Sequence, residues 1–133
     1  MKVIDFYKIL GFTSLYLFTG AAAAADDRIA VMHDAVSHVS VGDQVGISAT
    51  INDPHSDVET VRTYFKTSQD NRFYFVVMKK TSGNTYTGLL PAPLHGAESL
   101  EYRILAKSAS DQIVKSPRYV VEVENKGVIA RLD

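Results

Sequence analysis

Hydrophobic and polar residues alternate along two neighbouring stretches of this chain, 45–51 and 58–67. In the first, V-G-I-S-A-T-I, apolar residues take every second position, and the second, V-E-T-V-R-T-Y-F-K-T, resumes the pattern. Successive side chains of a β-strand point to opposite faces, so each stretch predicts a strand with one buried and one solvated face. The residues between them, N-D-P-H-S-D, favour a turn. We therefore expect two strands that cover the same core.

Five further segments have strand-like patterns and are separated by turn-forming residues. Ser-Gly-Asn at 82–84 predicts a hairpin, and Pro-Ala-Pro at 91–93 ends a strand because proline cannot donate to a sheet ladder. The expected strands are 28–32 with a continuation at Val39 and Val41, 73–79, 85–90, 100–107 and 119–123. We expect residues 128–132 to form either an eighth strand or a tail.

The spacing of these segments predicts a fold class. Seven strands that follow one another at intervals of roughly 8 to 15 residues, without helical periodicity between them, are typical of an antiparallel sandwich of two sheets. In the 58–67 strand, Val61, Thr63 and Phe65 are expected to face the core. The sequence therefore predicts an all-β protein with a single core.

The N-terminal residues have the pattern of a secretory signal peptide. Lysines near the start precede an uncharged apolar run at 9–18, and small residues at Ala23 and Ala25 suit a signal peptidase. We expect residues 1–25 to be removed and the mature chain to be periplasmic or secreted. An uncleaved membrane anchor is the alternative, although the uncharged stretch 9–25 is shorter than the roughly 20 apolar residues of a spanning helix.

Composition narrows the function classes. The chain has 133 residues and a net charge of -1, which suits one domain and gives no general attraction to nucleic acid or to an anionic membrane surface. It has no cysteine, which excludes disulfides, thiol catalysis and cysteine-bound metal centres. We expect a signal at 1–25, a sandwich at 26–124 and a tail or extra strand at 125–133, with no stable membrane insertion of the mature chain.

Five segments in this order resemble bacterial immunoglobulin-like or fibronectin type III-like domains of exported proteins. They are V-G-D-Q-V-G-I-S-A-T-I-N-D-P, V-E-T-V-R-T-Y-F-K, G-N-T-Y-T-G-L-L-P-A-P, L-E-Y-R-I-L-A-K and S-P-R-Y-V-V-E-V. The resemblance covers nearly all of the chain after residue 25. It implies an immunoglobulin-like sandwich that acts as a spacer, a stalk or a binding module.

The resemblance also implies how the strands are distributed. It places 58–67, 100–107 and 119–123 in one sheet, and 28–32 and 45–51 with 73–79 or 85–90 in the other. Related folds often have a tyrosine at the position of Tyr102, and its hydroxyl binds a nearby backbone group. We therefore expect a structural role for Tyr102.

Catalytic motifs are not found in the sequence. It contains no G-x-S-x-G, no H-E-x-x-H, no phosphate-binding loop and no cysteine nucleophile. The carboxylates Glu98 and Glu101 are best interpreted as loop and outer-strand charges. We expect the protein not to be an enzyme.

Metal binding is a second hypothesis, in which the chain is a periplasmic metal-binding protein. No two histidines are spaced as a local chelate, but His38 and His95 could meet at one end of a sandwich. Asp53, Asp57 and Asp111 could meet at the opposite end around calcium, although turn formation is the simpler role for them. We expect no metal and no other cofactor.

The outer face of the 58–67 and 100–107 strands is the predicted partner-binding surface. Arginine and aromatic side chains anchor many protein interfaces, and this face combines them. An ordinary solvated face, with Glu59 or Glu101 offsetting the arginines, is the alternative. A third hypothesis is a structural subunit of an envelope assembly whose 128–132 segment joins a neighbouring sheet. The residues expected to bind a protein or cell-envelope partner are Arg62, Tyr64, Lys66, Arg103, Leu105 and Lys107.

Overall fold

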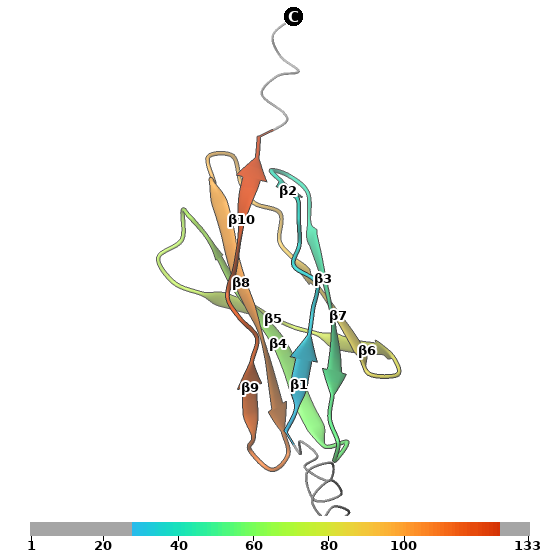
Figure 1. Cartoon of the computed structure of the whole chain (residues 1–133). Helices are drawn as coiled ribbons and strands as arrows, with labels where there is room; N and C mark the ends of the chain where they lie inside the picture. The colour runs from blue at the N-terminus through green and yellow to red at the C-terminus, as the bar shows by residue number, and fades with distance from the viewer. Residues whose placement is uncertain (1–27, 126–133) are drawn as a thin grey trace, which may run out of the picture.

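The computed structural model describes residues 28–125, which form ten strands in two sheets that pack against each other (Figure 1). No helix occurs in this range, so the prediction of an all-β sandwich is confirmed, but the predicted number of seven strands is too low. The strands are β1 (Ala30–Met32), β2 (Val39–Ser40), β3 (Val45–Asn52), β4 (Val58–Thr67), β5 (Tyr74–Val77), β6 (Lys79–Ser82), β7 (Thr85–Leu90), β8 (Ser99–Ser108), β9 (Ile113–Lys115) and β10 (Tyr119–Glu124).

One sheet has the strand order β1-β3-β7-β6, and the other has the order β2-β10-β8-β4-β5, with β9 also paired to β8. The strand pairs are antiparallel except for β2 and β10, which run parallel. In Figure 1, β9 and β10 follow one another along the same side of β8. The predicted grouping of 58–67, 100–107 and 119–123 is confirmed by β4, β8 and β10. The expectation that Val39 continues the 28–32 strand is wrong, because β1 pairs with β3 whereas Val39 pairs with β10 in the other sheet.

Alternate residues of the long strands fill the space between the sheets. The exposed fraction of each inward side chain of β3, β4 and β8 is 8% or less, so the predicted inner faces are confirmed. These core side chains are Val45, Ile47, Ala49, Ile51, Val61, Thr63, Phe65, Leu100, Tyr102, Ile104 and Ala106. Burial of their apolar surface is the main stabilising contribution in a domain without disulfides.

The prediction of one strand over 73–79 is wrong, because the chain changes sheets within it. Val77 pairs with β4, whereas Lys79 pairs with β7. Met78 between them is 3% exposed, and its N–H donates to the Val61 carbonyl at 2.8 Å. The nearly continuous apolar run concealed this crossing, since both halves are extended.

Neighbouring residues leave room for the Met78 side chain. Thr63 Oγ1 donates to Met78 Sδ at 3.1 Å. A Cβ at Gly88 would lie 3.1 Å from Met78 Cγ, which is a tight contact. Glycine within β7 therefore allows the crossing residue to pack closely against the opposite backbone.

The β9 strand was not among the predicted strands, and it ends at an interruption in the β8 pairing. Ser116 still bonds to β8: its N–H donates to the Ile104 carbonyl at 2.8 Å, and its hydroxyl oxygen accepts the Ile104 N–H at 2.8 Å. Pro117 has no N–H to donate, so the ladder breaks. Pairing resumes at Tyr119 in β10.

Several expectations concern residues that the structure does not describe. The signal peptide at 1–25, its cleavage after Ala25 and the strand or tail at 128–132 lie outside residues 28–125. Within the described range, no helix is long and apolar enough to cross a membrane.

Candidate partner-binding face

The predicted contact residues of β4 and β8 lie side by side on the outer face of the larger sheet. Arg62 is opposite Leu105, and Tyr64 is opposite Arg103 in the antiparallel pairing. Lys66 continues the row on β4. Each side chain is partly exposed, because the alternate residues of both strands are in the core. The register thus places basic, aromatic and aliphatic side chains on one surface.

The β5 strand extends this surface with apolar side chains that the sequence analysis did not include. Phe75 lies opposite Tyr64 and Val77 opposite Arg62, and they are 48% and 55% exposed. The Arg62 guanidinium carbon is 4.4 Å from the centroid of the Phe75 ring, and Arg62 Nη1 donates to the Tyr64 hydroxyl at 3.4 Å. The register between β4 and β5 places Phe75 beside Arg62 and Tyr64. That register could not be deduced from the pattern of one strand alone.

Cations also lie over two further aromatic rings, that of Phe73 just before β5 and that of Tyr74 at its first position. Lys66 Nζ is 5.2 Å from the centroid of Phe73, and the Arg72 guanidinium carbon is 5.5 Å from the centroid of Tyr74. Both rings remain more than 40% exposed. Tyr74 lies opposite Phe65, on the inward side of β4, so only the Lys66–Phe73 pair belongs to the outer face. A cation over an exposed ring contributes only about 0.5–1 kcal/mol, so that pair leaves the surface available for other contacts.

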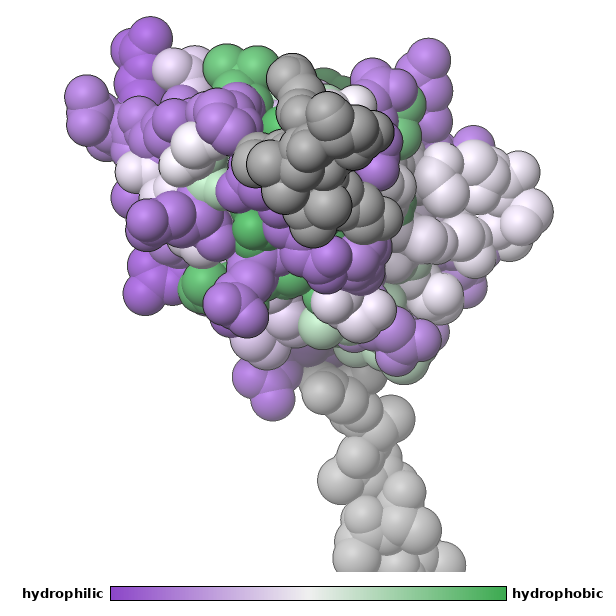
Figure 2. Space-filling view, turned by 90° about the horizontal axis from the view of Figure 1, so that it is seen from above, coloured by the Kyte–Doolittle hydropathy of each residue, from purple (hydrophilic) through white to green (hydrophobic). Residues whose placement is uncertain are grey.

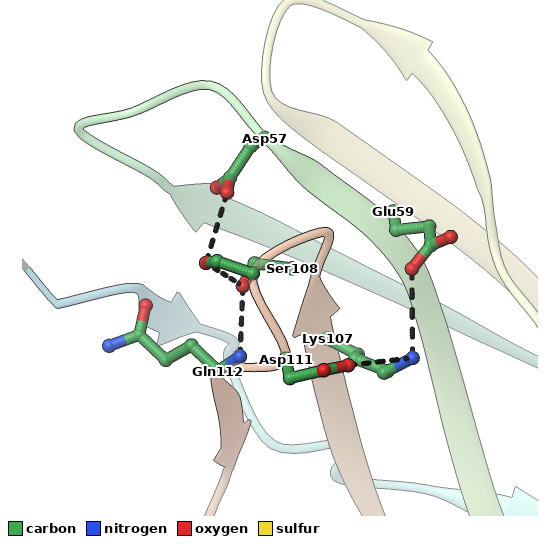
Figure 3. A network of polar contacts seen from close by, with 7 residues as sticks. Asp57, Glu59, Lys107, Ser108, Asp111 and Gln112 are labelled. Carbon is green, nitrogen blue, oxygen red and sulfur yellow. Dashed lines mark hydrogen bonds and ion pairs between the residues drawn. The ribbon is translucent and has the colours of Figure 1, made fainter.

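Lys107, at one end of the predicted face, is paired with two carboxylates of the protein itself. Its Nζ lies 3.6 Å from Glu59 Oε2 and 3.5 Å from Asp111 Oδ1, and Figure 3 shows it between them. Glu59 therefore offsets a cation, as expected for an ordinary solvated face. The structure makes Lys107 the weakest candidate among the predicted contact residues.

Arg103, in contrast, has no acidic partner among the described residues. The nearby carboxylate of Glu101 binds Arg118 instead, with 3.0 Å between Oε2 and Nη1. The Nε atoms of Arg103 and Arg62 are inaccessible to solvent and have no hydrogen-bond partner within residues 28–125. Buried donors usually find a partner, so these two arginines retain unused hydrogen-bonding capacity.

A hollow of about 290 Å³ lies on this face where β9 and β10 are interrupted. The interruption at Pro117 separates Lys115 from Arg118, and β4 and β8 supply the floor. Sequence reasoning missed Lys115 because it did not place β9 beside β8. The hollow is lined by Tyr64, Phe73, Arg103, Leu105, Lys115 and Arg118.

Tyr102, on the inner side of β8, belongs to a closed polar network. It is 0% exposed, and its hydroxyl accepts the Val36 N–H at 2.9 Å and lies 2.8 Å from His33 Nε2. His33 Nδ1 lies 2.6 Å from the Ser48 carbonyl oxygen, which can only accept, so Nδ1 donates. The predicted bond from Tyr102 to the backbone is confirmed, but its partner is 66 residues away. Burial raises the pKa of Tyr102, the hydrogen bond from the Val36 backbone opposes this, and the charge of Tyr119 adds to the rise, so that the pKa lies above its ordinary value.

The imidazole of His38 is bound within the domain, and His95 is held through its backbone carbonyl. His38 Nδ1 is 2.7 Å from Glu124 Oε1, and Gln69 Nε2 donates to the His95 carbonyl oxygen at 3.3 Å. Across 28–125, no group of three or more His, Cys, Asp or Glu side chains is placed to hold a metal ion.

From above, hydrophilic side chains cover most of the visible surface, with apolar atoms in separate patches (Figure 2).

The aspartates considered for calcium form turns and ion pairs. Asp53 accepts the N–H groups of His55 at 3.1 Å and Asp57 at 2.6 Å. Desolvation raises the pKa of Asp53, but hydrogen bonds from the backbone of His55, Asp57 and Val58 outweigh it and hold the pKa below its usual range. Asp111 binds Lys107, as Figure 3 shows. The Ser110 hydroxyl donates to Asp57 Oδ2 at 3.2 Å, so each of the three carboxylates has a partner within the described residues.

Comparison with known proteins identifies a fold likeness. No family model and no curated protein sequence matches the chain. The solved structures similar to it include the SrpA adhesin from Streptococcus sanguinis, with a TM-score of 0.52, 15% identity and coverage of 80% of this chain. A mutant of the same adhesin gives a TM-score of 0.51 and 14% identity over the same 80%. The alignment covers only 62% of each adhesin chain, and at this identity the likeness concerns the fold alone.

Proposed function

We propose that this chain is an exported, non-catalytic, immunoglobulin-like module that binds a protein or cell-envelope partner through the outer face of β4, β5 and β8. The observation that carries the proposal is the concentration of arginine, lysine and exposed aromatic side chains on that face. Arg62, Tyr64 and Phe75 are in mutual contact there, and Arg103 is without an acidic partner in the described range. Arginine and aromatic residues are over-represented among the residues that dominate binding energy.

The outer face of the other sheet supports this choice by contrast. The side chains that line its hollow are mostly small, polar or aliphatic, including Ser48, Thr87 and Leu89, and Lys79 lines it with them. No aromatic side chain lines that hollow. A partner that needs an aromatic and basic surface would therefore select the β4–β8 side.

The topology favours the immunoglobulin-like assignment. A sheet β1-β3-β7-β6 faces a sheet β2-β10-β8-β4-β5, the chain crosses between them at Met78, and the edge strand β2 runs parallel to β10. The fold likeness to an adhesin agrees with a binding role rather than with catalysis. The signal pattern at 1–25 is the basis for proposing a periplasmic or secreted location and a mature domain that begins at residue 26.

The proposal is tested by comparing face variants in a capture experiment. Protein carrying an N-terminal tag in place of residues 1–25 is incubated with solubilised envelope from cells that express it. The Arg62→Ala/Tyr64→Ala variant should recover less than about a tenth of the partner recovered by the wild type, because each side chain contributes to the centre of the interface. Its melting temperature should stay close to that of the wild type.

A matched control changes a cation and an apolar residue on the opposite sheet. Lys79→Ala/Leu89→Ala should capture as much partner as the wild type, since both side chains are on the other outer face. Equal capture by the wild type and by Arg62→Ala/Tyr64→Ala would refute the proposed face.

A further inference from the structure

The hollow on the β4–β8 face has two chemically different parts. Its floor consists of Tyr64, Phe73 and Leu105, which offer ring and aliphatic surface. Its rim carries Arg103 and Lys115, which extend from neighbouring positions along β8 and β9. An apolar pocket with a polar rim is the usual form of an interface anchor site, since burial of an apolar side chain supplies affinity and the rim supplies selectivity.

The charge of the rim is not neutralised by the protein. Arg118 is bound to Glu101, but Arg103 and Lys115 have no acidic partner among the described residues. Lys107, two outer positions beyond Arg103 on β8, does have such partners, Glu59 and Asp111. The net charge of the whole chain is only -1, so the positive charge is a local property of this site. An acidic group beside the hollow would therefore be attracted.

The hollow on the opposite outer face shows that size alone does not select this site. That hollow is larger, about 560 Å³, but glycine, serine and threonine residues line much of it, and Lys79 is its cation. It therefore offers neither an aromatic floor nor two cations at its rim.

We propose that the hollow is an anchor site for an acidic protein segment, which inserts one leucine or phenylalanine between Tyr64, Phe73 and Leu105 and places its carboxylates against Arg103 and Lys115. This inference rests on the proposed function and specifies the chemistry of the partner. Arg103 and Lys115 both line the hollow and have no acidic partner among the described residues, so their guanidinium and ammonium N–H groups are the donors proposed for those carboxylates.

The test uses three synthetic peptides and NMR titration of the ¹⁵N-labelled protein. The first peptide has a leucine in the middle of six glutamates, the second has alanine at that position, and the third has lysines in place of the glutamates. The leucine peptide should bind about ten times more tightly than the alanine peptide, because the larger side chain buries more apolar surface. The lysine peptide should not bind measurably.

Variants and salt separate the two parts of the site. Leu105→Ala should reduce the preference for leucine over alanine to less than about threefold, while Lys115→Gln should weaken both acidic peptides equally. Raising the salt from 50 to 500 mM should weaken both peptides but leave their ratio unchanged, since salt screens charges and not apolar burial. Lys79→Gln is the matched control and should have no effect on either peptide.

The outcomes distinguish the two proposals. Equal affinity for the leucine and alanine peptides would overturn the anchor site, and so would a Lys115→Gln variant that binds both as the wild type does. If envelope capture is still lost in Arg62→Ala/Tyr64→Ala, the face is retained and only the anchor fails. If the acidic peptides do not bind but vesicles of anionic lipid bind and are lost in Lys115→Gln, the occupant is a membrane surface and the protein-segment proposal is overturned.

Discussion

The two sides of β8 differ in how completely their polar side chains are hydrogen-bonded. On the inner side, the Tyr102 hydroxyl bonds to Val36 and His33, and the tyrosine is 0% exposed. On the outer side, Arg103 has no acidic partner within the described residues, and the neighbouring Tyr64 hydroxyl has a single long contact of 3.4 Å with Arg62. The inner groups are fully paired, whereas the outer groups are not.

This difference indicates which polar groups serve the fold and which are free to bind. A buried polar group that loses its partner costs the domain about 1–3 kcal/mol, so the inner network specifies the packing of the segment at 33–36 against β8. The outer groups contribute little to stability because water solvates most of them. Their substitution should therefore change binding without changing the fold.

The largest expected effect is the difference in stability between two variants, Tyr102→Ala on the inner side and Tyr64→Ala on the outer side. Tyr102→Ala should lower the free energy of unfolding by about 3–5 kcal/mol, because it leaves a cavity and unpaired polar groups in the core. Tyr64→Ala should lower it by less than about 1 kcal/mol. Urea denaturation of both variants measures the difference, and similar losses would contradict the assignment of opposite roles.

Removing only the hydroxyl groups should give a smaller effect of the same kind. Tyr102→Phe keeps the ring but deprives Val36 and His33 of a partner, so it should cost about 1–3 kcal/mol, whereas Tyr64→Phe should change stability by less than about 0.5 kcal/mol. His33→Ala should cost less in the Tyr102→Phe background than in the wild type, since both substitutions break one network. Additive losses in this cycle would show that the network is not cooperative.

Alkaline pH should distinguish the tyrosines further. The pKa of Tyr102 is raised in the folded state, so its contribution is fully present below the unfolded value of about 10 and is lost as the pH rises through the folded value. Tyr102→Phe should therefore lose less stability than the wild type between pH 9 and pH 11, as measured by thermal melting. Tyr64→Phe serves as the control and should follow the wild type.

The smallest effect is expected for Lys107. It is partly exposed and already paired with Glu59 and Asp111, so Lys107→Ala should change stability by less than about 0.5 kcal/mol. It should also retain most of the envelope capture that Arg62→Ala/Tyr64→Ala loses. A loss of capture comparable to that of the double variant would mean that the carboxylates do not reduce the role of Lys107.

The long strands and their two faces could be predicted from the sequence. Alternation in 45–51, 58–67 and 100–107 identified β3, β4 and β8, and it separated inner from outer side chains correctly. This worked because a strand with one buried face requires a period of two in its own sequence. Tyr102 was correctly expected to bond to the backbone, but its partners His33 and Val36 were not foreseen.

The short elements and the composition of the outer face could not be predicted in this way. The apolar run at 73–78 includes Met78 and continues into Lys79 without a turn residue, so its pattern does not reveal that the chain changes sheets at Met78. β9 has three residues, which is too few for a periodic pattern. Without these elements, Phe75 and Lys115 could not be placed beside the predicted residues.

The sequence by itself determined that the chain forms a two-sheet sandwich, which residues fill its core, and that Arg62, Tyr64 and Arg103 point away from that core. Local periodicity carries this information, because each strand must match the buried and solvated sides of its own sheet. Only the tertiary structure decided which cations are already paired, where the chain crosses between the sheets, and that a hollow opens beside Pro117. Those features depend on the register between strands that are distant in the sequence, and no single segment encodes that register.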